Sequence, residues 1–144
     1  MEEDRYYVDS AYSKGPHVIA NVLITPDGTE LVSKYRHDYV EYVDDNKKWY
    51  FVDGGTDYFR YGEDPESPAA KKQITNESPF SEIRQYFYWG TYGKNGDEPL
   101  QWKALKDLNT DHIKAILETQ KQLPEWRKNI FKAELTWRES NNNK

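Results

Sequence analysis

The sequence contains no cysteine, which excludes disulfide bonds, thiolate metal sites and cysteine nucleophiles. No apolar run approaches the roughly 18 residues that a membrane-spanning helix needs, so we expect no membrane association. The first five residues are mostly acidic and lead into no apolar stretch, so we also expect no secretory signal. A soluble, cytoplasmic protein is therefore predicted.

The chain also lacks an excess of positive charge. It carries 20 Lys and Arg against 25 Asp and Glu, a net charge of −5. Residues 1–72 hold 9 basic and 15 acidic side chains, and residues 73–144 hold 11 and 10. Proteins that bind duplex nucleic acid usually have a basic surplus, because they neutralise phosphates. The composition therefore argues against duplex nucleic acid as a partner.

Aliphatic residues are few, whereas aromatic residues make up 15% of the chain, with 12 tyrosines and 5 tryptophans. Aromatic rings can build a core, and they also dominate interfaces and ligand pockets. This excess predicts that some rings face a ligand or a partner subunit, and it favours a homo-oligomer.

The first half of the chain has the pattern of antiparallel β structure. Short β-rich runs are separated by turn sequences such as Pro26-Asp27-Gly28 and Asp53-Gly54-Gly55. This spacing predicts a meander of four or five strands. The expected strands are residues 18–24, 29–36, 39–43, 49–52 and 58–61.

The second half predicts helices. Residues 62–76 lack periodicity and are expected to form a surface loop. A first helix is expected to begin with Ser78 as N-cap and to stop at Gly90, and a glycine-rich loop should link it to the later helical region. Two further helices are expected, one from about Asn109 and one after Pro124, where Trp126, Ile130, Ala133 and Trp137 form an apolar stripe. We predict one α+β domain over residues 1–144, with frayed ends at 1–4 and 140–144.

No pattern supports a metal site or a catalytic site. The histidines at positions 17, 37 and 112 lie far apart and show no ligand spacing. No Gly-x-Ser-x-Gly elbow occurs, and an acid pair such as Asp53 with Asp57 is equally typical of a turn. We therefore expect no catalytic residues, no metal and no cofactor.

Phosphate binding without catalysis has better support. Arginine and lysine side chains suit phosphate oxygens, glycine turns can present backbone N–H groups to an anion, and Trp or Tyr rings can stack on a base. An alternative remains open, in which the same cations are ordinary surface charges. The predicted ligand-binding residues are Arg36, His37, Arg60, Trp89, Tyr92, Lys94 and Asn95.

Several sequence blocks together resemble a group of small phage and prophage proteins. The blocks are Arg36-His37-Asp38-Tyr39, the stretch from Val52 to Arg60, and Trp89-Gly90-Thr91-Tyr92-Gly93-Lys94, and the resemblance covers about residues 29–137. Within that group, the layout is similar to the Thoeris anti-defence protein 1 family. The resemblance implies a cyclic ADP-ribose sponge, which binds an immune signal without hydrolysing it, in the cytoplasm of a bacterial host.

Three functions are expected, the first from the resemblance and the other two as alternatives to it. The first is sequestration of a small nucleotide of the cyclic ADP-ribose type. The second is inhibition of a host enzyme by direct protein–protein contact, with the acidic first half as the interface and Tyr and Trp as anchors. The third is hydrolysis of a nucleotide second messenger, which turnover of the ligand would distinguish from sequestration.

Overall fold

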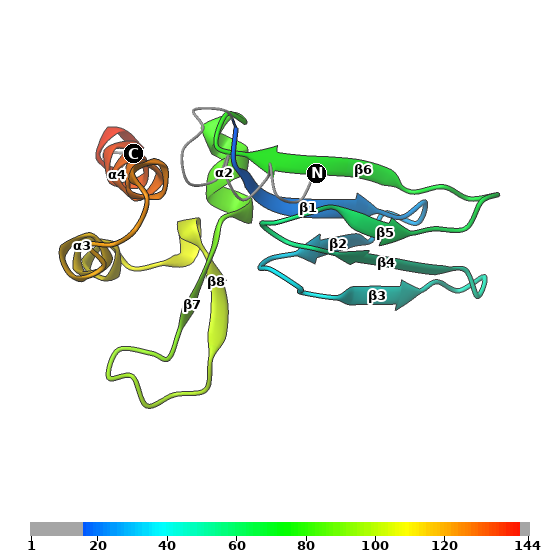
Figure 1. The fold of residues 1–144 in the computed structure, drawn as a ribbon, viewed down its shortest axis with the longest axis horizontal. Helices are drawn as coiled ribbons and strands as arrows, with labels where there is room; N and C mark the ends of the chain where they lie inside the picture. The colour runs from blue at the N-terminus through cyan, green and yellow to red at the C-terminus, as the bar shows by residue number, and fades with distance from the viewer. Residues whose placement is uncertain (1–15, 142–144) are drawn as a thin grey trace. The chain divides into compact units, whose positions relative to one another are not determined.

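The computed structural model describes residues 16–141 of a chain that divides into two compact units, Met1–Phe87 and Tyr88–Lys144 (Figure 1). The expectation of one domain stays a prediction. Strands dominate the first unit and helices the second, so the α+β class is confirmed. The elements of the first unit are β1 (Val18–Ile24), β2 (Glu30–Ser33), β3 (Val40–Val43), β4 (Trp49–Asp53), β5 (Arg60–Gly62), β6 (Ala70–Thr75) and α2 (Phe80–Tyr86).

The strands of the first unit form two antiparallel sheets, in the orders β2-β1-β6 and β3-β4-β5. Strand β6 lies in the segment that was expected to be a surface loop, so that prediction is wrong. Its strand character depends on pairing with β1, in which Val18 lies opposite Thr75 and Ile24 opposite Ala70. The chain therefore returns to its first strand after the meander.

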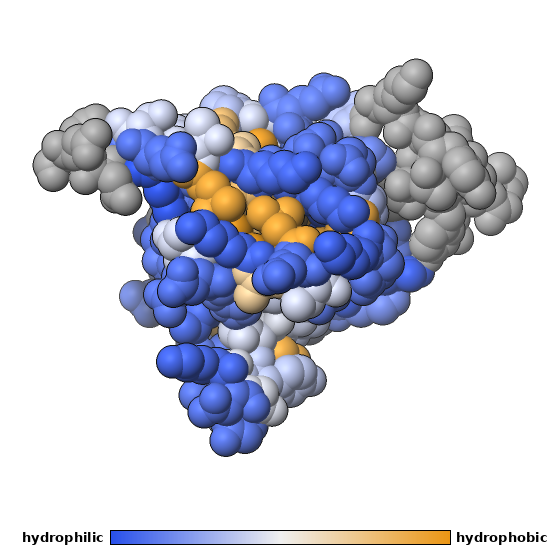
Figure 2. All heavy atoms as spheres, turned by 90° about the vertical axis from the view of Figure 1, so that its left-hand side faces the viewer, coloured by the Kyte–Doolittle hydropathy of each residue, from blue (hydrophilic) through white to orange (hydrophobic). Residues whose placement is uncertain are grey.

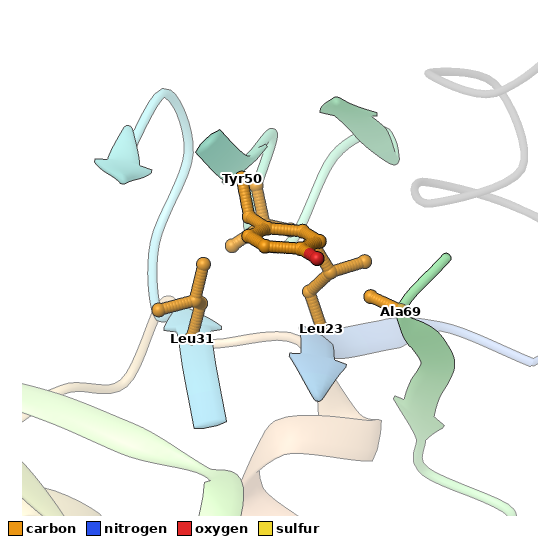
Figure 3. Packing of buried hydrophobic residues seen from close by; sticks show 5 residues of the cluster. Leu23, Leu31, Tyr50 and Ala69 are labelled. Carbon is orange, nitrogen blue, oxygen red and sulfur yellow. The ribbon is translucent and has the colours of Figure 1, made fainter. Parts of the chain in front are cut away.

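The two sheets of the first unit pack together through the alternate residues of each strand. Leu23 and Leu31 lie opposite each other on the first sheet, and they pack with Tyr50 and Val52 of the second sheet and with Ala69 (Figure 3). The buried Tyr50 also donates its hydroxyl hydrogen to the Ser67 carbonyl at 2.8 Å. The opposite face of β4 therefore points away from this core.

The β1–β2 turn is fixed by the Asp27 carboxylate. Asp27 accepts hydrogen bonds from the Thr25 and Tyr42 hydroxyls, the latter at 2.5 Å, and from the Thr29 N–H at 3.1 Å. These bonds, with the Thr25 hydroxyl first, hold the pKa of the Asp27 carboxyl well below its usual range. Because Tyr42 belongs to β3, this turn also connects the two sheets.

Helix α2 packs on the other face of the first sheet. The Tyr86 hydroxyl donates to Glu30 at 3.0 Å, and Glu82 pairs with Lys72 at 2.7 Å. The start of the helix differs from expectation, because the Ser78 hydroxyl accepts a bond from the Thr75 N–H and caps nothing in the helix. The helix also ends at Tyr86, before Gly90.

The second unit begins with a hairpin where we had expected a loop between helices. The glycine-rich segment connects β7 to β8, with Gly90 opposite Trp102 in the ladder. The sequence signal was misleading because glycine ends helices and forms hairpin turns with equal ease. The elements of this unit are β7 (Tyr88–Thr91), β8 (Gln101–Ala104), the 3₁₀ helix η1 (Leu105–Asp107), α3 (Thr110–Thr119) and α4 (Glu125–Asn141).

Helix α4 buries Ile130, Phe131 and Glu134, and not the whole stripe that includes Trp126 and Trp137. Glu134 pairs with Arg138 at 2.7 Å, and Arg138 also donates to the Leu105 carbonyl and the Thr110 hydroxyl. This ion pair, in which Glu134 is buried and Arg138 is partly exposed, connects α4 to η1 and α3.

Two further expectations concern the ends of the chain and its oligomeric state. Ser140 and Asn141 belong to α4, residues 1–4 and 142–144 lie outside the described residues, and the expectation of frayed ends stays a prediction. Figure 2 shows apolar side chains among hydrophilic ones on the side of the second unit that carries α3 and α4. The homo-oligomer stays a prediction.

Candidate functional site

Two of the predicted ligand-binding residues, Arg36 and His37, lie in the connection between β2 and β3. The Arg36 Nε lies 2.5 Å from Asp57 Oδ2, and the His37 Nδ1 lies 2.8 Å from the Tyr58 hydroxyl. His37 has a φ of 67°, which is uncommon for a residue other than glycine. Both side chains therefore contact the β4–β5 connection.

The third predicted cation, Arg60, begins β5. Its Nη2 lies 2.6 Å from Asp53 Oδ2, and its guanidinium carbon lies 5.2 Å from the centre of the Phe51 ring. The hydrogen bond to Asp53 raises the pKa of Arg60 above its ordinary value. Both arginines thus already have carboxylate partners, which reduces the attraction that either offers to a phosphate.

The Gly54–Gly55 turn does not present an anion nest. The Gly54 N–H donates to Asp53 Oδ1, and the Gly55 N–H donates to the Ser33 hydroxyl, both at 2.8 Å. The fully buried Asn21 side chain donates to the carbonyls of Gly55 and Tyr58. The distinctive residues around positions 36 and 54 therefore serve largely to hold the β2–β3 and β4–β5 connections together.

The other four predicted residues belong to the β7–β8 hairpin of the second unit. Trp89 packs edge-on against the buried Phe131, with 5.3 Å between ring centres, and this packing orients it toward α4. Tyr92, Lys94 and Asn95 are exposed around the turn. The Gly93 N–H donates to the Thr91 hydroxyl, so this turn also uses a backbone donor internally.

The seven predicted residues are therefore divided between the units. Arg36, His37 and Arg60 contact the β4–β5 connection or the residues beside it in the first unit. The hairpin residues from Trp89 to Asn95 belong to the second unit. The prediction of one pocket built from all seven remains a prediction.

The most distinctive surface of the first unit is the outer side of sheet β3-β4-β5, which we call the aromatic face. It lies opposite the buried Tyr50 and Val52, because successive residues of a strand point to opposite sides. Tyr39 precedes β3 on this side, and Arg60 of β5 lies opposite Asp53. The aromatic face consists of Tyr39, Glu41, Val43, Trp49, Phe51 and Arg60.

The rings of the aromatic face pack on one another, with Phe51 half-buried and the two outer rings exposed. Phe51 lies between Tyr39, at 5.2 Å, and Trp49, at 5.1 Å between ring centres. Phe51 also lies opposite Gly62, where an added Cβ would come within 2.5 Å of its ring, so the ring lies directly over the glycine. The exposed fractions are 45% for Tyr39, 45% for Trp49 and 54% for Val43.

Glu41 holds the polar atoms of the two outer rings. Its Oε1 accepts from the Trp49 indole N–H at 2.8 Å and from the Tyr39 hydroxyl at 3.2 Å. Burial first, and then this hydrogen bond, raises the pKa of the Tyr39 hydroxyl. The rings are therefore fixed in position while their apolar surface faces outward.

Our sequence reasoning did not single out Tyr39, Trp49 and Phe51 as site residues. The available signal was the alternation in Trp49-Tyr50-Phe51-Val52, because a strand with large aromatic residues on both sides cannot bury both within one small sheet. Which side is buried depends on β1 and β2, and the local pattern does not give that answer.

Within residues 16–141, no group of three or more His, Asp or Glu side chains is placed to hold a metal ion. Among the same residues, no helix is both long and apolar enough to cross a membrane.

Comparisons of the chain with protein-family models, with curated proteins and with solved structures found no match. The resemblance to phage proteins therefore stays a prediction.

Proposed function

We propose that this protein functions by binding another protein through the aromatic face, without catalysing a reaction on it. In a phage setting, that partner is a host protein whose activity is blocked by stoichiometric binding. The observation that carries the proposal is the mutually packed group of Tyr39, Trp49 and Phe51, in which the two outer rings, Tyr39 and Trp49, are exposed. Tyrosine and tryptophan are the residues most enriched where protein interfaces gain their binding energy.

The rigidity of the aromatic face supports this function. A side chain that is already fixed loses little conformational entropy when a partner covers it. Trp49 and Tyr39 are held by Phe51 on one side and by Glu41 through their polar atoms. Their remaining exposed area is apolar, and removing it from water on binding is favourable.

We expect Trp49→Ala to weaken the complex at least about 30-fold, the effect of losing an interface anchor worth about 2 kcal/mol. The protein and its variants are used to capture partners from a bacterial host lysate, and each captured protein is then purified and titrated calorimetrically. Tyr92→Ala removes an exposed ring from the second unit and serves as the matched control, with affinity expected within about twofold. Equal affinity of the Trp49 variant, or capture of no protein at a one-to-one ratio, would contradict the proposal.

Nucleotide sequestration is the second candidate, and one observation favours it. The Arg60 side chain is 60% exposed and lies over Phe51, so a cation and a ring that suit a phosphate and a base occur side by side. Of its nitrogens, only Nη2 bonds to a carboxylate within the described residues. The remaining guanidinium donors are therefore available to a phosphate.

For this second candidate, we expect heat on titration with one member of a panel of cyclic nucleotides and cyclic ADP-ribose isomers. The ligand should be recovered intact after the protein is denatured by heating. Arg60→Ala should weaken binding by about 2–5 kcal/mol, whereas Lys103→Ala, on an exposed lysine of β8, should not. Unchanged affinity of the Arg60 variant would remove this candidate. Recovery of a chemically altered ligand would indicate the third function, hydrolysis of a nucleotide second messenger.

A further inference from the structure

We propose that the partner of the aromatic face places an arginine side chain over the ring of Trp49 or Tyr39, where its guanidinium pairs with Glu41. This inference rests on the proposed protein-binding function and specifies the chemistry of the partner at one position. The occupant is thus a protein segment with an exposed arginine, and neither a nucleic acid nor a nucleotide.

Among the described residues, the Glu41 carboxylate has one oxygen that is hydrogen-bonded and one that is not. One carboxylate oxygen, Oε1, accepts both the Trp49 and the Tyr39 hydrogen bond, so the carboxylate is oriented by two rings. In residues 16–141, no lysine or arginine forms a salt bridge with Glu41, and no hydrogen bond reaches its Oε2. The lone pairs of Oε2 therefore remain for an incoming guanidinium, which can donate charge-assisted hydrogen bonds to this oxygen.

The rings of Trp49 and Tyr39 also favour an arginine. Trp and Tyr faces attract cations, and a planar guanidinium also stacks on them. The aromatic face already contains one such arrangement, since Arg60 lies over Phe51 with its charge balanced by Asp53. An incoming arginine that lies over Trp49 or Tyr39 and pairs with Glu41 would repeat the same combination of ring and carboxylate.

The charge around the aromatic face favours a positively charged partner segment. Residues 39–66, which include the whole aromatic face, contain 8 acidic and 3 basic side chains, a net charge of −5. Two of the three basic residues, Lys48 and Arg60, form salt bridges with Asp64 and Asp53. Arg36 and Lys71, from outside the segment, pair with Asp57 and Glu63, so 8 acidic side chains face 5 basic ones and a net charge of −3 remains. The resulting negative potential attracts a cationic segment and repels a phosphate.

The test follows the Trp49 indole N–H signal by NMR while N-acetyl-arginine amide is added. We expect a saturable shift with a dissociation constant of about 1–10 mM, typical of a single side-chain contact, which weakens as salt increases. N-acetyl-citrulline amide has nearly the same shape without the charge, and it should bind at least tenfold more weakly. Glu41→Gln keeps an acceptor for both rings but loses the charge, and it should also reduce binding at least tenfold.

The matched control is Glu66→Gln, which removes an exposed acid of the same segment and should leave arginine binding within about twofold. An equal shift with citrulline, an unchanged affinity in Glu41→Gln, or a stronger response to AMP would overturn the inference. If Trp49→Ala abolishes capture of a protein that Glu41→Gln still binds fully, the arginine inference fails and the proposed function stands. If arginine binds as expected but no protein is captured, the proposed function fails.

Discussion

Replacing Glu134 with leucine is expected to lower the free energy of unfolding by about 3–5 kcal/mol, the usual cost of leaving one member of a buried ion pair behind. Glu134 is fully buried, and its Oε2 lies 2.7 Å from the Arg138 Nε. Arg138 would keep its bonds to the Leu105 carbonyl and the Thr110 hydroxyl, but its charge would be uncompensated. The loss is measured by urea unfolding followed by tryptophan fluorescence, because four of the five tryptophans belong to the second unit.

Two matched variants test the cause of that loss. Lys132→Met breaks an exposed contact of the same helix, 3.8 Å from Glu125, and should change the free energy of unfolding by less than about 0.5 kcal/mol. Glu134→Leu combined with Arg138→Met removes both charges and should recover most of the lost stability. A double variant as unstable as the single one would show that the charge is not the cause.

Replacing Gly55 with alanine is expected to destabilise the first unit by about 3–5 kcal/mol, which is among the largest effects of a single substitution. Gly55 has a φ of 50°, a left-handed conformation that costs a residue with a Cβ about 1–2 kcal/mol. The new Cβ would also lie 1.9 Å from the Tyr35 carbonyl oxygen. The backbone must therefore move and break the hydrogen bond to Ser33, which costs about 1–3 kcal/mol more.

The control for this prediction is Gly28→Ala, in the same unit. Gly28 has a φ of 92°, but no atom lies within 4 Å of its added Cβ, so only the conformational cost of about 1–2 kcal/mol should appear. Thermal unfolding followed by far-ultraviolet circular dichroism measures both variants. Equal melting temperatures for the two variants would contradict the proposed clash at Tyr35.

The elements that were predicted well are those with local signals. The strand from Val18 to Ile24 ends at the Pro26-Asp27-Gly28 turn, and the structure places both there. Helix α3 begins at Thr110 after Asn109, and α4 follows Pro124 directly. The boundaries at Pro26-Asp27-Gly28 and Pro124 depend on proline and glycine, whose effect extends over only a few residues. Asn109 stands at the N-cap position of α3, although its side chain makes no capping hydrogen bond.

The elements that were missed depend on distant partners. Strand β6 contains Lys71, Lys72 and Gln73, which give it no apolar period, and it is a strand because β1 offers it an edge. Glu134 lies within an apolar stripe at helical spacing, and its burial depends on Arg138 together with backbone carbonyls of η1. A pattern along the chain cannot report such pairings.

The candidate site shows the same limit. Arg36 and Arg60 have the chemistry of phosphate ligands, and the sequence also contains Asp53 and Asp57 nearby. Only the folded connections show that each arginine pairs with one of these acids. The aromatic residues were visible as an excess in composition, but their separation into buried Tyr50 and exposed Trp49 required the second sheet.

The pairing of β1 with β6 means that the two neighbours of β1 are synthesised at very different times. Strand β2 follows β1 after one short turn, whereas the pairing of Val18 with Thr75 can form only after Thr75 has left the ribosome. During that interval β1, which is largely apolar, has one unpaired edge, and such an edge is a template for pairing with another chain. Slow translation between β2 and β6 is therefore the condition under which nascent chains of this protein are most exposed to misassembly.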